Sequence, residues 1–450
     1  MSFRMLRNQQ LLCSGDVAMF DSFSVTTTTV PATGPDIAPA PLPYSPVADP
    51  FGPLSLVVSP AMPCPPSHAT VDAIPLDIAH HFAALPDPRH PAFCDRHALT
   101  DILVISLTAV LCGAKSWEAI AAFGTAKLAW FRTIGLQLRN GIPSHDTFSR
   151  IFAALNPQAF QQAFTGWINS VCNTLGFCHI PIDGKTVRGS RGPDGTALHL
   201  VSAWASEHRL SLAQIAVADK SNEITAIPRL LQLLDVHGAL VSIDAMGCQK
   251  AIARAIRAGE GDYLLAVKDN QPTLYSDVQL CFATARASGY EGVSHDTFVT
   301  EEVNHGRYEK RVYTVIYEPS GLSTQDEWVD LKAVVEVERT VRVGDKESKE
   351  VSHYINSSNR ASARMLAQAI RGHWGIENGQ HWVLDVIFGE DRCRTRQGNA
   401  AENLAWLRKM VLSLFGQDDT KGSIPTRQFL AAADDAYRLR MLHLLSEKSA

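Results

Sequence analysis

The chain has 450 residues, which is too long for one small hydrophobic core and predicts two or three folding units. Hydrophobic residues make up 46% and charged residues 19%, which excludes a wholly disordered or fibrous chain. The net charge of -5 argues against a protein that holds nucleic acid through bulk charge alone, but a local basic groove remains compatible with it.

The sequence predicts no membrane partner. Its longest apolar run, Ile102 to Ala114, is 13 residues long, whereas a bilayer-spanning helix needs about 20. Polar residues interrupt the N-terminal region, so we expect no signal peptide and a cytoplasmic protein. The nine cysteines are scattered without a CxxC pair, so neither a disulfide framework nor a cysteine zinc site is indicated.

Residues 1–76 predict a proline-rich disordered extension. Of the 24 prolines, 13 lie between Pro31 and Pro75, and the segment has no lysine or glutamate. Such a stretch offers too little periodic apolar surface to offset the entropy of ordering it. An alternative stays open, in which the natural chain starts at Met62 or later.

Residues 77–178 predict a helical N-terminal domain, because apolar residues recur at i, i+3 and i+4 spacing. Pro143 and Ser144 precede one such helix, with Ser144 as its expected N-cap. The domain could contain a pair of DNA-reading helices or serve as a packing and dimerising bundle, and the pattern leaves both open.

Residues 179–450 predict a mixed α/β domain, since three strands are followed by alternating helices and strands. The expected strands are 179–185, 198–205, 210–218, 239–243 and 262–267, with helices at 224–234 and 250–258. A β-rich insertion is expected at about 290–355, and helices at 362–388 and 400–415 follow it.

Three acids form the candidate catalytic set. Asp183 and Asp244 each follow a strand, and Glu377 lies in the late helix. Phosphoryl-transfer enzymes that act on nucleic acids cluster carboxylates in this way, because these hard oxygen ligands hold two Mg²⁺ ions about 4 Å apart. For either aspartate alone, the alternative is an ordinary turn or cap residue.

The late helix carries acids and histidines at every fourth position, so neighbouring members share a face. The set is His373, Glu377, His381 and Asp385, with Trp374 and Trp382 beside it. A zinc site is a minor alternative, because the HExxH pattern is absent and no cysteine assists. The tryptophans could belong to the core or stack on bases.

Five separated segments, in order, resemble the ISAs-one family of insertion-sequence transposases, the H-repeat-associated type, which is related to the wider IS-four group of DDE transposases. The late-helix segment His373-Trp374-Gly375-Ile376-Glu377-Asn378, with His381-Trp382-Val383-Leu384-Asp385-Val386 and Glu390-Asp391, is similar to the family's C-terminal signature. The other four segments are 85–89, 143–150, 182–190 and 243–271. The resemblance covers about 77–415.

This resemblance implies an RNase H-like core with a β-rich insertion, preceded by an α-helical domain. It implies that Asp183, Asp244 and Glu377 bind Mg²⁺, with Mn²⁺ as a substitute, and that the chain acts on double-stranded DNA as a homodimer. The wider IS-four group has a tyrosine, an arginine and a lysine where this chain has Ile370, His373 and Leu384. We therefore carry over no hairpin step.

Basic residues near the acids are the candidate DNA contacts. They are Lys185, Arg188, Lys268, His373 in its protonated form, Arg392, Arg394 and Arg396. Alternate spacing would put the last three on one side of an extended segment, where guanidinium groups suit phosphates, although an ordinary solvated surface is an even alternative.

The sequence thus predicts a transposase that binds the ends of its insertion sequence, cleaves phosphodiester bonds and transfers 3′-hydroxyl ends to target DNA. One alternative is a catalytically inactive or domesticated DNA-binding derivative. Another is a two-carboxylate glycosidase, which would need no metal.

Overall fold

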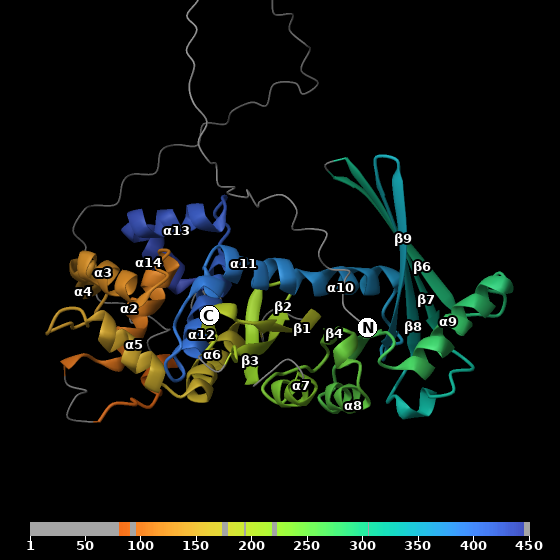
Figure 1. Cartoon of the computed structure of the whole chain (residues 1–450), viewed down its shortest axis with the longest axis horizontal. Coiled ribbons are helices and arrows are strands. Elements are labelled where there is room, and N and C mark those ends of the chain that lie inside the picture. Colours follow the sequence, from red (N-terminus) through yellow and green to blue (C-terminus); the bar gives the residue numbers. More distant parts are fainter. Residues whose placement is uncertain are drawn as a thin grey trace, which may run out of the picture. The chain divides into compact units, whose positions relative to one another are not determined.

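The computed structural model describes residues 81–90, 96–172, 179–192, 195–217, 223–304 and 306–444. All of them belong to one unit, residues 69–450, which combines a nine-stranded mixed sheet with helices (Figure 1). The disordered extension predicted for residues 1–76 lies outside the described residues. No described helix is both long and apolar enough to cross a membrane.

The N-terminal helices form where the apolar spacing predicts them. They are α2 (Leu99–Leu111), α3 (Trp117–Ala126), α4 (Leu128–Thr133), α5 (His145–Ala154) and α6 (Pro157–Cys172). The predicted cap is confirmed, because the Ser144 side chain accepts a hydrogen bond from the Thr147 backbone N–H. Nearly the whole of α2 is buried, so it is the centre of this helical group.

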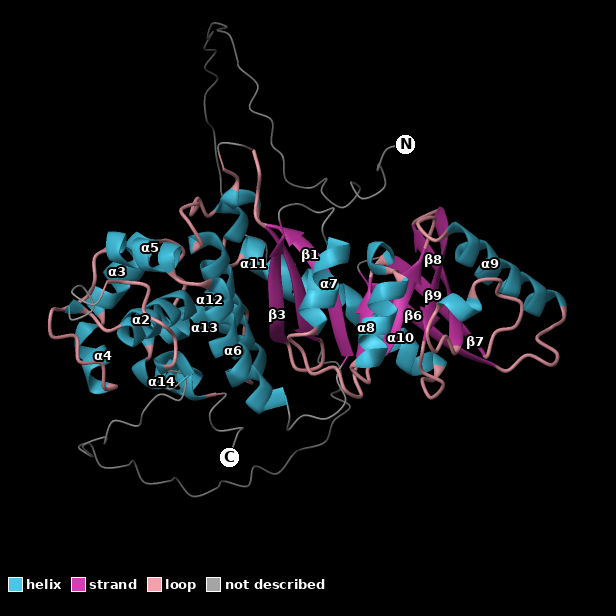
Figure 2. Ribbon diagram, turned by 90° about the horizontal axis from the view of Figure 1, so that it is seen from below, coloured by secondary structure: helices cyan, strands magenta, loops and turns pink. Residues whose placement is uncertain are grey.

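The last helices of the chain complete this helical group. They are α12 (Ala400–Gln417), α13 (Ile424–Ala433) and α14 (Asp435–His443), and α12 contacts α2, α5 and α6 (Figure 2). On its other side α12 contacts β3 (Leu210–Val217) of the sheet. This one helix therefore connects the N-terminal helices to the sheet through buried side chains.

The first part of the sheet has the strand order β3-β2-β1-β4-β5. β1 (His179–Thr186), β4 (Leu240–Ile243) and β5 (Asp262–Val267) are parallel, and β2 (His199–Ala205) and β3 are antiparallel to their neighbours. Pro181 lies early in β1, before the recorded pairing with β2 starts at Ile182. β1 itself is inside the sheet and not at its edge.

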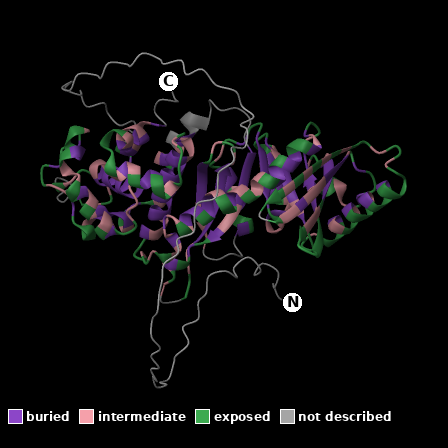
Figure 3. Cartoon of the chain, turned by 90° about the horizontal axis from the view of Figure 1, so that it is seen from above, coloured by how far each residue is buried: buried purple, intermediate pink, exposed green. Residues whose placement is uncertain are grey.

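The β-rich insertion continues the same sheet. α9 (Pro272–Ala287), which the periodicity did not predict, precedes β6 (His295–Asn304), β7 (Arg307–Tyr317), β8 (Ala333–Val343) and β9 (Lys346–Asn356). β9 pairs antiparallel with β5, so the order extends to β9-β8-β7-β6. Buried residues gather near this junction and the hairpin ends are exposed (Figure 3).

Helices cover both faces of the sheet. α7 (Glu223–Leu231) contacts β2 and β3, and α8 (Lys250–Ala258) contacts β5. α10 (Ala363–Ile376) contacts β1, β4, β6 and β7. The late helix predicted over 362–388 runs from Ala363 to Val386, and a π-helical turn, η6 (Glu377–His381), lies within it between α10 and α11 (Trp382–Val386). Such turns occur often at functional sites.

A buried lysine lies between α12 and the sheet. The Lys409 ammonium donates hydrogen bonds to Ser202 Oγ at 2.7 Å and to Gln214 Oε1 at 2.6 Å. Burial lowers the pKa of Lys409 to about 7. Above that pH the folded protein therefore keeps a neutral amine in its core.

We expect Lys409→Met to change how the stability of the protein depends on pH. Between about pH 7 and pH 10.5 the unfolded lysine binds a proton that the folded one releases, so the wild type gains stability as pH rises. The gain is at most about 1.4 kcal/mol per pH unit. Denaturant unfolding across this range should show the rise in the wild type and in Lys346→Met, which changes an exposed lysine. Parallel curves for the wild type and Lys409→Met would contradict the burial argument.

Candidate active site

The two aspartates lie at the same level of the sheet. Ile182 of β1 pairs with Ile243 of β4 in a parallel ladder, and each is followed directly by an aspartate. Asp183 is still inside β1, whereas Asp244 ends β4. The carboxyl ends of parallel strands meet at one edge of a sheet, so both side chains belong to the same edge.

Asp244 also caps the turn that follows it. Its Oδ1 atom accepts hydrogen bonds from the backbone N–H groups of Met246 at 3.1 Å and Gly247 at 3.2 Å. The cap interpretation and the catalytic one are therefore compatible, because these two bonds use only one carboxylate oxygen.

Glu377 reaches this edge from the helix side. It is the first residue of η6 and follows α10, which contacts both β1 and β4. Burial raises the pKa of Glu377, and the charge of Asp244 raises it further. The structure thus brings the three predicted acids together.

Asp183 shows the largest effect of this environment. Burial raises the pKa of Asp183 to about 7, and the charges of Asp244, Glu377 and Glu223 contribute. Among the described residues, no group of three or more acids, histidines or cysteines is arranged to hold a metal ion. The donor chemistry nevertheless suits a hard cation, because oxygen ligands that repel one another are stabilised by a divalent ion between them.

The residues that recur at every fourth position of the late helix contact β1 and β4. Of this set, His373, His381 and Asp385 make the contacts. His381 Nδ1 lies 3.5 Å from Asp183 Oδ2, and burial lowers the pKa of His381 to about 3, so the ring is neutral. Ser242 Oγ lies 2.9 Å from His373 Nδ1 and 2.8 Å from His179 Nε2. These contacts connect η6 to β1, α10 to β4, and β4 to β1.

His373 therefore has a place in the interior of the site. Burial lowers its pKa, which favours the neutral ring over the protonated one that a phosphate contact needs. Ile370 and Leu384, which occupy the positions where the wider group has polar residues, are buried in the core.

The Lys185 ammonium forms ion pairs with two carboxylates. Its ammonium lies 2.6 Å from Asp385 Oδ1 and also contacts Glu390, which is fully buried. Burial alone would lower the pKa of Lys185, but Glu390 and Asp385 raise it above its usual value. Arg408 lies on the other side of Glu390, 3.8 Å from its Oε1 atom. From the sequence, Glu390 stood out only as part of a motif. No local pattern predicts that the turn containing Glu390 contacts Lys185 of β1.

The other predicted basic residues are exposed. Arg188 lies beside the segment that carries Arg392, Arg394 and Arg396, because η2 (Arg188–Ser190) packs on η7 (Glu390–Arg392). The approach is so close that a Cβ on Gly189 would lie 2.1 Å from the Cys393 carbonyl oxygen. The three later arginines are exposed and alternate with half-buried residues, but Arg392 ends the turn η7, so the extended segment begins only at Cys393. Lys268 is exposed after the end of β5.

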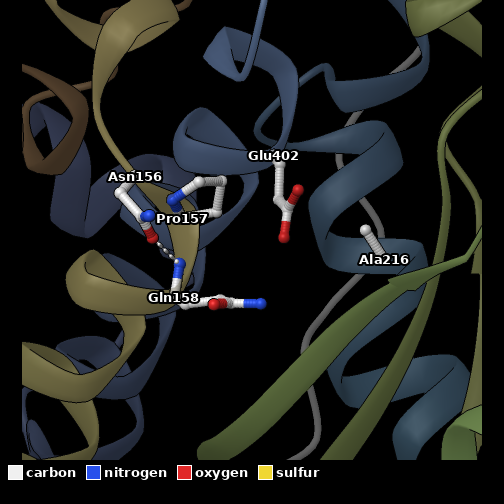
Figure 4. A pocket seen from close by; sticks show the side chains of 5 residues that line it. All are labelled: Asn156, Pro157, Gln158, Ala216 and Glu402. Carbon is white, nitrogen blue, oxygen red and sulfur yellow. Dashed lines mark hydrogen bonds between the residues drawn. The ribbon is translucent and has the colours of Figure 1, made fainter.

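A separate pocket of about 330 Å³ does not involve the acids. Asn156, Pro157 and Gln158 line it together with Ala216 and Glu402, between α6, α12 and β3 (Figure 4). None of the predicted site residues reaches it, so it does not compete with the sheet edge as the candidate active site.

We expect Lys185→Met to destabilise the protein strongly. The change leaves the buried Glu390 carboxylate without its closest cation, which costs about 3–5 kcal/mol for a buried pair. Thermal unfolding should show a large fall in midpoint, whereas Arg188→Met at an exposed position should change it little.

The double variant Lys185→Met/Glu390→Gln provides the control for this prediction. Removing both charges should recover part of the loss, because no carboxylate is then buried unpaired. Unfolding of Lys185→Met at the wild-type temperature would contradict the role given to this contact.

Two family models match successive parts of the chain. Residues 79–168 match the family described as DDE_Tnp_1-associated, and residues 175–414 match the family described as Transposase DDE domain. Escherichia coli O157:H7 YncI, which carries transposase in its name, is 39% identical over 82% of this chain and 94% of its own length.

A second relative is YhhI of Escherichia coli K12, named as an H repeat-associated transposase. It is 36% identical over 81% of this chain and 97% of its own length. A solved structure of the piggyBac transposase synaptic complex with hairpin DNA covers 81% of each chain at 10% identity, and its TM-score of 0.38 is too low to establish a shared fold. The sequence matches alone are decisive: the chain belongs to the Transposase DDE domain family.

Proposed function

We propose that the chain is a DNA transposase that binds the ends of its insertion sequence, cleaves phosphodiester bonds and transfers the 3′-hydroxyl ends to target DNA. The observation that carries this proposal is the position of Asp183, Asp244 and Glu377 at one sheet edge, where burial, with the charges of Asp244 and Glu377 added, raises the pKa of Asp183 to about 7. The strand order β3-β2-β1-β4-β5, with β1, β4 and β5 parallel, supports an RNase H-like core.

In this proposal Asp183, Asp244 and Glu377 would hold two Mg²⁺ ions, with Mn²⁺ as a substitute. Such ions, when bound, activate the attacking water or 3′-hydroxyl and stabilise the leaving oxygen. The protein contributes the placement of the carboxylates. The neutral His381 ring lies against Asp183, and the turn after β4 fixes one oxygen of Asp244.

The DNA contacts that we propose are the exposed basic residues. Arg188 lies beside Arg392, Arg394 and Arg396, and Lys268 lies at the end of β5. Lys185 and His373 act instead as positioning residues, because their polar atoms already contact buried groups.

Double-stranded DNA is the proposed partner, and a homodimer is the proposed form on DNA. Because the net charge is -5, DNA binding has to come from local basic residues. Two subunits that bind one DNA together would hold it more tightly than either subunit alone. We place this activity in the bacterial cytoplasm, at the nucleoid when DNA is bound.

Asp183→Asn should abolish metal-dependent cleavage of DNA that carries the element ends. Loss of a metal ligand removes several kcal/mol of transition-state stabilisation, so the rate should fall about a thousandfold or more. Cleavage gels in Mg²⁺ measure the rate, and Asp345→Asn in the β8–β9 turn is the matched control. Cleavage by Asp183→Asn at the wild-type rate would overturn the assignment. A wild type that binds these ends in gel shifts without cutting them would favour a DNA-binding derivative.

Binding of the metal can be measured without any DNA. A cation that binds only the folded state stabilises it by RT ln(1 + [cation]/Kd), so the unfolding temperature rises with the logarithm of the cation concentration once that concentration exceeds Kd. We expect Mn²⁺ to raise the midpoint of the wild type and of Asp345→Asn, and to leave Asp183→Asn and Asp244→Asn unchanged. An equal rise in all four proteins would place the cation elsewhere.

A further inference from the structure

Asp244 differs from the other two acids in how it is held. Asp183 lies inside β1 and pairs with Ser202 of β2, and Glu377 belongs to the helical segment that runs from α10 through η6. Asp244 follows the last residue of β4 and is exposed. Strand pairing and burial therefore do not hold this carboxylate in place, and its position depends on the turn that follows it.

That turn is η4 (Ala245–Gly247), and it packs tightly against the strand before it. A Cβ on Gly247 would lie 2.2 Å from Ile243 Cγ2, so only glycine fits here without displacing Ile243. The backbone N–H groups of Met246 and Gly247 both donate to Asp244 Oδ1. The orientation of the carboxylate therefore follows the orientation of these two peptide groups.

Two side-chain amides from another part of the chain hold this turn. They belong to the β5–α9 connection, residues 268–271, which follows the neighbouring parallel strand β5. Asn270 Nδ2 donates to the Ala245 carbonyl oxygen, and Gln271 Nε2 donates to the Cys248 carbonyl oxygen at 2.9 Å. The two bonds thus hold the turn at its first residue and at the residue just after its end.

The β5–α9 connection is itself anchored. The Gln271 backbone N–H donates to the Lys268 carbonyl oxygen at 2.9 Å, which closes a turn across the connection. Pro272 then starts α9, whose Leu274 and Val278 side chains are buried. The two amides therefore project from a segment with a fixed backbone, which is what a group that positions another residue requires.

The bonds to the turn leave one oxygen of Asp244 for a ligand. Both hydrogen bonds that the carboxylate accepts use Oδ1, and within the described part of the chain no hydrogen bond reaches Oδ2. A hard divalent cation takes carboxylate oxygens of this kind as ligands. How well Oδ2 serves depends on how firmly the 245–248 turn is held.

We propose that Asn270 and Gln271 are positioning residues for Asp244, whose amides hold the 245–248 turn so that Oδ2 keeps one direction for a divalent cation. Groups that orient a metal ligand without touching the metal typically change the affinity about 10–100-fold when they are removed. The inference rests on the proposed function and deepens it, because it adds two residues of the β5–α9 connection to the metal site.

The test is a titration of the full chain with Mn²⁺ in the absence of DNA, in which electron paramagnetic resonance measures the free ion. Asn270→Ala removes one donor, and Gln271→Met removes the other while keeping the length of the side chain. Each change should raise the apparent Kd for Mn²⁺ about tenfold. Gel shifts in EDTA should show wild-type DNA binding by both variants. Weakened DNA binding with an unchanged Kd for Mn²⁺ would make the two residues DNA contacts and overturn the inference.

Matched controls make the same kind of bond away from the acids. Asn140 is an exposed asparagine whose Nδ2 donates to the Arg96 carbonyl oxygen at 2.8 Å, and Gln417 is a half-buried glutamine whose Nε2 donates to the His208 carbonyl oxygen. Asn140→Ala and Gln417→Met should leave the Kd for Mn²⁺ unchanged. A wild-type Kd in both Asn270→Ala and Gln271→Met would overturn the inference, and so would an equal rise of the Kd in the controls.

The two proposals fail separately. Mn²⁺ binding that depends on Asp183 and Asp244 but not on Asn270 or Gln271 would remove the positioning inference alone. Cleavage that survives Asp183→Asn would remove the proposed function, whatever Asn270→Ala and Gln271→Met show.

Discussion

The parallel pairing of β1 with β4 is the contact on which the site depends. Because Ile182 faces Ile243 in this ladder, the two aspartates that follow are side by side. A slip by one residue would turn Asp183 to the opposite face of the sheet and break the pair. α10 then contacts both strands, and the contact of Ser242 with His373 holds that helix against β4, which sets the position of Glu377 at its end.

Buried charge forms a second layer beneath the carboxylates. Lys185, two residues after Asp183 in β1, contacts the buried Glu390, and Lys409 lies nearby in α12. Burying charges is costly unless they are paired, so these contacts specify one arrangement of β1, α11 and α12 rather than add much to stability. They also explain why Lys185, which the sequence suggested as a DNA contact, lies in the interior of the site.

Local patterns were sufficient to predict most elements. The helix 250–258 and the strand 262–267 have the predicted bounds, and β1 and β2 differ from the prediction by one residue at one end. What could not be predicted depends on pairing between distant segments. The junction of β9 with β5, the burial of Glu390 and the π-helical turn after α10 leave no mark in hydrophobic periodicity, because each is decided by a partner far away in the chain.

The junction of β9 with β5 sets the order in which the sheet can be completed during synthesis. β5 leaves the ribosome with one edge open, and its partner β9 follows only after α9 and three further strands. An open edge of a buried strand is a template for pairing with another chain. The nascent protein thus has an aggregation-prone interval that ends when the insertion folds back. Since domains fold as units during translation, slow synthesis across residues 268–345 would lengthen that exposure.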